Sequence, residues 1–488
     1  MPYLTNSGGA VRPHALFSGK SLPEYGQAIS EAGAVVADAV ASANHPATPR
    51  PPAHLRSVVR QVDLDRPLGE LSSALEESRD LFLEHAVWFH DARYQAHLNC
   101  PVATAAIAAD VIASSVNTSV DTWDQSLAAT HIETHLLEWL AGRLRLGDLA
   151  DGVFTSGGTA SNLQALLLAR EHSTADGTPL DALRILTSPE AHFSVTKAAR
   201  TLGLAADAVV HCPTDERGRL RPDGVESAID DAEKAGLTVM AVCATAGTTD
   251  RGAVDPLAAL AQITHGRGLW LHVDAAVGGA LVTSSRHSSL LDGIGGADSV
   301  TVDFHKTWYQ PVAASALLVR DRRMFAHSRT NADYLNPEHA RVPNLVDKSL
   351  ATSRRFDALK PWITLRTHGA DAIGSWLDAS LDLAQEAHTI AEAMPDLEVF
   401  ERPSTHMLLF RFTAVDLEQR DDVNDAIRET LFMEGRTVIA RTRWGGETWL
   451  KLTLLNPMAD AADLRATFDD VVRTGHLLAG DLSAEVSA

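Results

Sequence analysis

A lysine in the stretch SVTVDFHKTWYQP, residues 299–311, is the residue whose surroundings most suggest chemistry. Lys306 follows the alternating apolar residues of an expected buried strand, and a histidine precedes it. The chain contains only seven lysines against 35 arginines, so arginine supplies most of its surface positive charge. A lysine at the end of a buried strand is shielded from water, loses its proton more readily, and can then form a Schiff base with an aldehyde.

Three further segments could take part in chemistry, and each also has a structural explanation. His192 in PEAHFSVTKAARTLG lies at a strand-to-helix junction, where it could equally cap the helix or sit in the core. Asp274 in LWLHVDAAVGG follows apolar residues, so it is either a buried carboxylate that needs a partner or a loop cap. The glycine pair in FTSGGTASNLQALLLAR precedes a helix whose first N–H groups could bind an anion or simply form a tight turn.

Taken together, these four features predict one cofactor. Pyridoxal phosphate requires a cradle for its phosphate, a flat neighbour for its ring, a carboxylate for its ring nitrogen and a lysine for its aldehyde. Competing motifs do not fit, because no GK[ST] follows the glycine pair and Phe154 stands where a GxSxG elbow would begin. His192 has no second His or Cys at ligand spacing beside it, so no metal site is predicted.

The elements that must position these residues lie between residues 150 and 320, where short apolar strands alternate with helices. The expected strands are DGVFTSGG, RILTSPEAHFS, AVVHCP, LTVMAVCATAG, LWLHVDAA, SVTVDFHK and ASALLVR. Such a pattern predicts an α/β fold with a mostly parallel central sheet and helices on both faces. Ligands of these sheets bind at the carboxyl ends of the strands, where the candidate residues fall.

The length of 488 residues predicts more than one domain. We expect an N-terminal helical dimerisation segment over residues 1–95, interrupted by the proline-rich linker SANHPATPRPPAHLR. A large cofactor-binding α/β domain is predicted for 96–370 and a small C-terminal α+β domain for 371–488.

The composition excludes several classes of partner. A net charge of −21 without a basic cluster argues against nucleic acid, and the chain has no run of eighteen apolar residues that could cross a membrane. The three cysteines are isolated, and the N-terminus has no apolar signal region. We therefore expect a cytoplasmic protein.

The sequence resembles the group II pyridoxal-phosphate-dependent amino acid decarboxylases. The resemblance covers roughly residues 60–460 and rests on TSGGTASNLQALLLAR, AHFSVTKAA, ATAGTTDRG, LHVDAAVGG and DFHKTWYQP. The segments FHDARYQAHLNCPV, SVDTWDQS and NLVDKSLATSRRFDALKPW are most similar to the siderophore-pathway, desferrioxamine-type lysine decarboxylases. The resemblance implies an aspartate-aminotransferase-like, fold type I architecture and a homodimer with shared active sites.

The resemblance also implies roles for single residues. Gly158 and Thr159 are expected to bind the phosphate of the cofactor, together with Asp303 or His305. His192 is expected to stack on one face of the ring, Ala276 to pack on the other, and Thr249 to contact the ring substituents. Asp274 is expected to pair with the ring nitrogen, and Lys306 to form the Schiff base. Lys306, His192 and Asp274 are the expected catalytic residues. The expected substrate-binding residues are His97, Asn99, Asp124, Gln125 and Tyr334, some of them supplied by the partner subunit.

Two positions depart from the family. A tyrosine of a mobile loop often returns a proton after carbon dioxide has left, and Leu345 stands at its place here. Tyr334 matches only the start of that loop. The arginine that the family places before xxxxNP is Lys451 in this chain.

The expected substrate is a basic amino acid, with lysine first and ornithine or 2,4-diaminobutyrate next. The segment HLNCP is polar and small, and NTSVDTWDQS offers Asp121, Asp124 and Gln125 but no cation. A distal ammonium needs such acceptors, although both aspartates could equally be loop or cap residues. The alternatives are a glutamate or aromatic amino acid decarboxylase, a decarboxylation-dependent aldehyde synthase, and a binding protein without activity on the same fold.

Overall fold

A seven-stranded sheet forms the centre of the large domain in the computed structural model, which describes residues 15–486 and the side chains of residues 15–480. In spatial order its strands are β2 (Asp151–Thr155), β8 (Ser315–Val319), β7 (Ser299–Asp303), β6 (Trp270–Asp274), β5 (Thr238–Thr245), β3 (Leu183–Thr187) and β4 (Val209–His211). β8 runs antiparallel to both of its neighbours, and the other neighbouring strands pair in parallel. The predicted fold class is confirmed, and each of the seven expected segments contains a strand.

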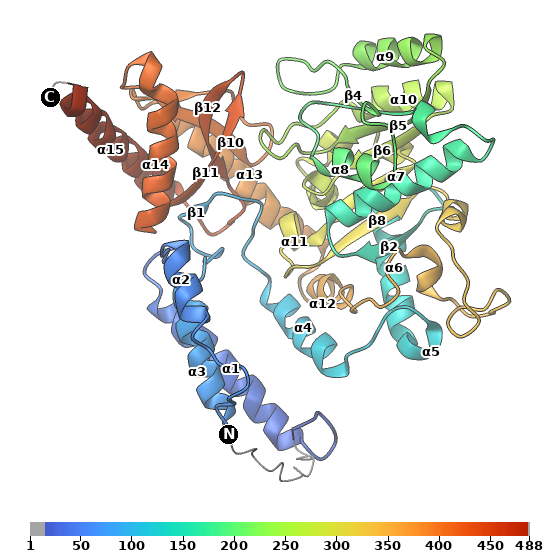
Figure 1. Ribbon diagram of the computed structural model, residues 1–488, viewed down its shortest axis with the longest axis horizontal. Helices are drawn as coiled ribbons and strands as arrows, with labels where there is room; N and C mark the ends of the chain where they lie inside the picture. Colours follow the sequence, from blue (N-terminus) through green and yellow to red (C-terminus); the bar gives the residue numbers. More distant parts are fainter. Residues whose placement is uncertain (1–14, 487–488) are drawn as a thin grey trace, which may run out of the picture.

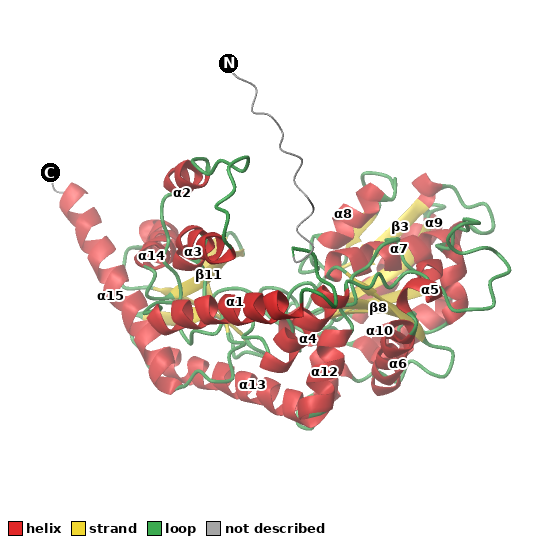
Figure 2. Cartoon of the chain, turned by 90° about the horizontal axis from the view of Figure 1, so that it is seen from below, coloured by secondary structure: helices red, strands yellow, loops and turns green. Residues whose placement is uncertain are grey.

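Helices cover both faces of this sheet. α7 (Gly158–Thr174) and α8 (Ser194–Thr201) pack on one face, and α6 (Ala128–Arg143), α9 (Pro222–Lys234) and α10 (Leu257–Arg267) pack on the other. Because side chains alternate along a strand, the neighbours Val153 and Phe154 belong to opposite cores. Figure 2 shows α8 on one side of the strands and α6 and α10 on the other. Two covered faces explain why successive residues of the central strands are buried, whichever face they point to.

The small domain is a second sheet with helices packed on it. Its strand order is β1-β11-β12-β10-β9, with β9 (Leu397–Val399), β10 (Met407–Phe412), β11 (Val438–Trp444) and β12 (Glu447–Thr453). The helices are α13 (Ala370–Glu392), α14 (Arg420–Glu434) and α15 (Ala461–Val486). The two-residue strand β1 (Tyr94–Gln95) pairs in parallel with β11. The segment that precedes the large domain in the sequence therefore adds an edge strand to the small one.

Three N-terminal helices extend away from both domains (Figure 1). They are α1 (Leu22–Ser42), α2 (Pro52–Val59) and α3 (Leu71–Leu81), and none contains a buried residue. α2 begins inside the proline-rich stretch that was expected to be a linker, since proline is compatible with the first turn of a helix. The part of the expected N-terminal helix before residue 15 lies outside the described residues.

α4 (Thr104–Val116) and the short α5 (Trp123–Ser126) connect this arm to the large domain. Within residues 15–486, no helix is both long and apolar enough to cross a membrane. The described side chains include no group of three or more His, Cys, Asp or Glu that could hold a metal ion.

Candidate active site

A cavity of about 340 Å³ opens where the carboxyl ends of β5, β6 and β7 meet the start of α7. All nine residues expected to bind the cofactor line it, namely Gly158, Thr159, His192, Thr249, Asp274, Ala276, Asp303, His305 and Lys306. The remaining lining residues are Ser156, Gly157, Ala160, Asn162, Thr245, Gly247 and Val277. Parallel strands bring these distant segments to one edge of the sheet.

The start of α7 forms one wall of the cavity. The helix begins at Gly158, directly after β2 and the turn that follows it, and its first N–H groups have no acceptor within the helix. A Cβ at residue 158 would lie 3.0 Å from Oδ2 of Asp303 and 3.2 Å from Cβ of Ala276. Glycine lets the helix begin close to the floor of the cavity without crowding these atoms, so its N–H groups and its dipole are placed to bind an anion there.

Asp274, the last residue of β6, is 7% exposed and is held by two donors. The backbone N–H of Ala276 donates to its Oδ1 at 3.0 Å, and Nδ2 of Asn162 donates to its Oδ2 at 2.7 Å. Both bonds stabilise the charged carboxylate in a dry site. The hydroxyl of Thr301 donates to Oδ1 of Asn162 at 2.7 Å, which fixes the orientation of the amide.

Sequence reasoning did not single out Asn162. Its side chain is almost completely buried in the first turns of α7. The available signal was a polar residue within a strongly helical, largely apolar segment.

Lys306 lies in the four-residue helix α11 (Phe304–Thr307), and not on the strand as the sequence suggested. β7 ends at Asp303, and the turn that follows places Lys306 on the same side as that aspartate. Its Nζ lies 2.9 Å from Oδ2 of Asp303, and the lysine side chain is 21% exposed. Ser315 donates to the other oxygen of Asp303 at 2.6 Å.

His192 lies on another wall of the cavity and is tied to the same network. Its Nδ1 lies 2.8 Å from Oγ of Ser194, which accepts a hydrogen bond from Asn162 at 2.9 Å. Burial lowers the pKa of His192, and Lys306 lowers it further, against opposite effects of Asp274 and Asp303. The neutral imidazole is favoured, which suits stacking on a flat ring.

His305 and Asp303 offer different chemistry to a phosphate. The Nδ1 of His305 donates to the carbonyl of Ala314 at 2.8 Å, and its Nε2 lies 3.7 Å from Asp303. The Asp303 carboxylate is acceptor-only and would repel a phosphate, so its place beside Lys306 suits the holding of an ammonium group.

The five residues expected to bind substrate are not among the lining residues of this cavity within one subunit. Asp124 accepts a hydrogen bond from the Thr122 hydroxyl at 2.6 Å, and Gln125 donates to the same hydroxyl at 3.1 Å. Tyr334 is 89% exposed. Asp121 is buried and accepts from the backbone N–H of Thr122 at 2.7 Å, which is the loop-capping role.

His97 and Asn99 lie in the segment that precedes α4. Asn99 accepts a hydrogen bond from the hydroxyl of Tyr94 at 3.0 Å. Burial lowers the pKa of His97, and the nearby cations Lys451 and Arg428 lower it further. His97 therefore lies near two cations of the small domain.

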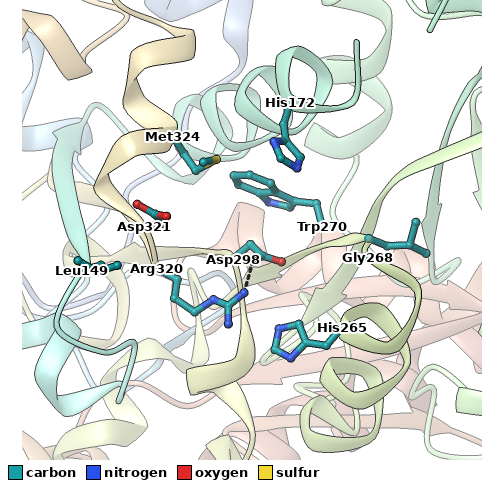
Figure 3. Close-up of a pocket in the computed structure, with 10 residues that line it drawn as sticks. Leu149, His172, His265, Gly268, Trp270, Asp298, Arg320, Asp321 and Met324 are labelled. Carbon is teal, nitrogen blue, oxygen red and sulfur yellow. Dashed lines mark hydrogen bonds and ion pairs between the residues drawn. The ribbon is translucent and has the colours of Figure 1, made fainter. Parts of the chain in front are cut away.

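A second cavity, of about 540 Å³, lies at the opposite edge of the same sheet (Figure 3). Trp270 begins β6 and Asp298 precedes β7, so this cavity is at the amino ends of the parallel strands. The Arg320 guanidinium lies 2.6 Å from the Asp298 carboxylate, which satisfies both charges. Its lining residues include no lysine. We assign the chemistry to the first cavity, where a lysine, an imidazole and a buried carboxylate converge.

The chain is similar to known proteins over most of its length. Residues 60–413 match the family described as "Pyridoxal-dependent decarboxylase conserved domain". An L-2,4-diaminobutyrate decarboxylase of Rhizobium meliloti is 40% identical over 87% of this chain and 86% of its own, and one of Acinetobacter baumannii is 36% identical over 84% and 85%.

A solved structure shares the fold and much of the sequence. It is the glutamate decarboxylase domain of diaminobutyrate-pyruvate transaminase and L-2,4-diaminobutyrate decarboxylase from Vibrio parahaemolyticus, 32% identical, with a TM-score of 0.87 over 94% of this chain and 97% of that one.

The first cavity fits pyridoxal phosphate residue by residue. It offers a helix start for a phosphate, a fixed carboxylate for a ring nitrogen, an imidazole and a methyl group for the ring faces, and a lysine for an aldehyde. The match covers more than half of the chain, and the site has the donor set that the cofactor needs. This chain belongs to the pyridoxal-dependent decarboxylases, which use pyridoxal phosphate to remove carbon dioxide from an amino acid.

Proposed function

We propose that this protein decarboxylates L-2,4-diaminobutyrate to 1,3-diaminopropane. The observation that carries the proposal is the pair of relatives with that name, which match more than four fifths of the chain. Lysine, which the sequence placed first, and ornithine become the alternatives. One methylene changes binding by only about 1–3 kcal/mol, so we expect activity on more than one diamino acid.

The chain's residues have separate tasks in this reaction. Pyridoxal phosphate, when bound, supplies the electron sink for the electron pair that carbon dioxide leaves behind. Asp274, held by Asn162 and Ala276, would accept a hydrogen bond from the ring nitrogen and so keep a proton there. The start of α7 and His305 would hold the phosphate, and His192 would orient the ring. Lys306 would hold the aldehyde, and its amine is placed to move protons at the reacting carbon.

A buried cation lies beside the cavity wall, where the substrate carboxylate could approach it. Lys451 replaces the arginine of the family, and its side chain is 7% exposed. Its Nζ lies 3.2 Å from the carbonyl oxygen of Thr249, a residue of the cavity wall, and 2.8 Å from Oδ1 of Asp250. We propose that Lys451 attracts the carboxylate to this side of the cavity.

We propose that the protein acts as a homodimer with shared active sites. α1 buries none of its 21 residues and exposes Ile29, Val36 and Val40. α4 also exposes the apolar residues Ile107, Ile112 and Val116. A second copy of the chain would cover these faces. It would also bring Asp124, Gln125 or Tyr334 to the cavity of its neighbour, where an acceptor could bind the distal ammonium of the substrate.

A second candidate activity is aldehyde synthesis coupled to decarboxylation. The observation in its favour is Leu345, which takes the place of the tyrosine of the family and is only 2% exposed, packed in the core of the large domain. Oxygen uptake and peroxide formation during turnover would support the synthase, and a diamine formed without oxygen uptake would exclude it.

The decisive test is carbon dioxide release from a panel of amino acids, with the products identified by mass spectrometry. The panel contains 2,4-diaminobutyrate, ornithine, lysine, glutamate and an aromatic amino acid. The highest kcat/KM is expected for 2,4-diaminobutyrate, and a highest value for glutamate or the aromatic acid would contradict the proposal. Use of the diamine in siderophore synthesis and a cytoplasmic location stay predictions that rest on the sequence.

A further inference from the structure

Arg251 is a buried cation at the contact between the two domains. Its side chain is 1% exposed, although it follows the cavity residue Thr249 by only two positions. The guanidinium carbon lies 4.9 Å from the ring centre of Phe400 and 4.6 Å from that of Trp444. Both rings belong to the small domain, so a cation of the large domain is enclosed by aromatic rings of the other.

Carboxylates from both domains surround the same guanidinium. Nη2 of Arg251 lies 2.6 Å from Oε1 of Glu401 in the small domain, and Nη1 lies 3.5 Å from Oε1 of Glu190 in the large domain. The carbonyl of Glu216 accepts a further hydrogen bond at 2.7 Å. A Cβ at Gly218 would lie 2.7 Å from Glu190 and 2.8 Å from Arg251, at a positive φ, so the neighbouring loop has room only for glycine.

Two segments that line the cofactor cavity also contribute residues to this cluster. Glu190 precedes His192 by two residues, and Arg251 follows Thr249 by two. Between Thr249 and Arg251, Asp250 contacts the small domain through Lys451 at 2.8 Å and the Thr442 hydroxyl at 2.7 Å. Three consecutive residues therefore join the cavity wall to strands β11 and β12.

We propose that Arg251 is a positioning residue that couples the position of the small domain to the placement of His192 and Thr249 against the cofactor. Arg251 donates hydrogen bonds to Glu401 and contacts the two rings on one side, and it forms an ion pair with Glu190 at 3.5 Å on the other. A shift of the small domain would therefore change the position of the segment that carries His192. The inference rests on the family's reaction and does not depend on which amino acid is the substrate.

The state of Glu190 supports a role beyond stability. The charged groups that face it are Arg251, Asp250 and Glu401. Burial raises the pKa of Glu190 to about 7, against the attraction of Arg251, so its charged form is held at a net free-energy cost. Above about pH 7 the ionised Glu190 attracts Arg251, and below it this attraction is lost.

The test compares Arg251→Met, Arg251→Lys and Glu190→Gln with Arg286→Met in the purified holoenzyme. Arg286 forms an exposed ion pair with Asp382 of α13, at 2.6 Å, and is a matched control away from the cavity. Decarboxylation is followed with whichever amino acid of the panel releases carbon dioxide. We expect kcat of Arg251→Met to fall at least tenfold with KM changed less than threefold, and Arg251→Lys to recover part of the loss.

Glu190→Gln keeps the side-chain shape and serves as the main test if Arg251→Met fails to fold. We expect its kcat at pH 8 to fall three- to tenfold without a lower melting temperature. We also expect the pH profile of its kcat to lose the change near pH 7 that the ionisation of Glu190 causes in the wild type. Arg286→Met should keep kcat within twofold of wild type.

A measurement without cofactor or substrate completes the test. Hydrogen–deuterium exchange of the apoprotein should become faster over residues 188–194 in Glu190→Gln and stay unchanged in Arg286→Met. The proposal is overturned if Glu190→Gln and any folded Arg251 variant keep kcat within twofold, or if exchange over 188–194 does not change. A different best substrate would overturn the proposed function and leave this result intact.

Discussion

Nδ2 of Asn162 on α7 donates a hydrogen bond to Oδ2 of Asp274 at the end of β6, over 2.7 Å. The same amide group donates to Ser194, the partner of His192, at 2.9 Å. One side chain thus aligns the carboxylate that we propose for the ring nitrogen and the imidazole that we propose for the ring face. Because all three groups are buried or half-buried, their positions are set before the cofactor binds.

Asn162→Ala should lower kcat about 10- to 100-fold, because a hydrogen bond to a charged group contributes about 1.5–3 kcal/mol. Thr301→Val removes only the hydroxyl that donates to Oδ1 of Asn162, so its effect should stay below tenfold. Steady-state kinetics and the visible spectrum of the bound cofactor measure both. Equal losses in the two variants would show that packing, and not the bond to Asp274, matters here.

Reduction with borohydride should attach the cofactor covalently to Lys306, since its Nζ is the one lysine amine among the residues that line the cavity. Peptide mass spectrometry locates the adduct. Lys306→Ala should lose the adduct and at least about 10³-fold in kcat, because it removes the covalent anchor and a proton carrier. Lys348→Ala, a lysine paired with Asp151, should keep both. An adduct on another lysine would contradict the assignment.

Gly158→Ala should weaken cofactor binding at least tenfold, because the new Cβ would lie 3.0 Å from the Asp303 carboxylate and push the helix start away. Gly142→Ala is the matched control: it lies in α6, where a Cβ would meet nothing within 4 Å. Alanine there should stabilise the helix by about 0.5–1 kcal/mol. Spectroscopic titration of the apoprotein with pyridoxal phosphate measures the first effect, and urea unfolding measures the second.

His406 should make the free energy of unfolding depend on pH. Burial lowers its pKa from 6.5 to about 4, and neither ring nitrogen has a hydrogen-bond partner. Between those pH values the unfolded chain binds more protons than the native one, so stability falls as pH decreases from about 6.5 to about 4 and levels off below. His406→Leu should remove up to about 3 kcal/mol of this dependence, at about 1.4 kcal/mol per pH unit.

Urea unfolding at several pH values measures this slope for the wild type and the variant. His265→Gln changes an exposed histidine at the second cavity and serves as the control, because its slope should match that of the wild type. An unchanged slope in His406→Leu would show that another group carries the pH dependence.

Ile29→Asp should convert the proposed homodimer to a monomer and lower activity, because it introduces a charge on the exposed apolar face of α1 that we expect a second copy to cover. Leu417→Asp changes a more exposed apolar residue in the small domain and should leave the dimer intact. Light scattering together with activity checks both. A wild-type monomer with full activity would refute the shared active site.

The convergence of the candidate cofactor residues on one cavity could be predicted from the sequence, because the chemistry needs few residue types and the fold dictates their positions. Apolar strands alternating with helices give a parallel sheet, and its carboxyl ends meet at one edge. A lysine, an aspartate, a histidine and a glycine pair at those ends therefore fall around one cavity, even though they are far apart in the sequence.

Other features were decided only by tertiary structure. Asn162 becomes important because α7 packs across the ends of β6 and β7, and nothing in its local sequence specifies Asp274 or Thr301 as partners. The pairing of β1 with β11 joins segments more than 300 residues apart, which no local pattern encodes. The substrate-binding residues were harder still to predict, because within one subunit Asp124 and Gln125 are both hydrogen-bonded to the Thr122 hydroxyl.

Arg251 shows the same limit most clearly. In the sequence it is one arginine among 35, in a turn that also contains an aspartate and two glycines. Folding brings Phe400, Glu401 and Trp444 around it from a different domain. A sequence determines which side chains can do chemistry and which periodic elements carry them, because both depend on short-range covalent order. Which distant groups share a buried charge depends on how the domains pack, and only the tertiary structure decides that.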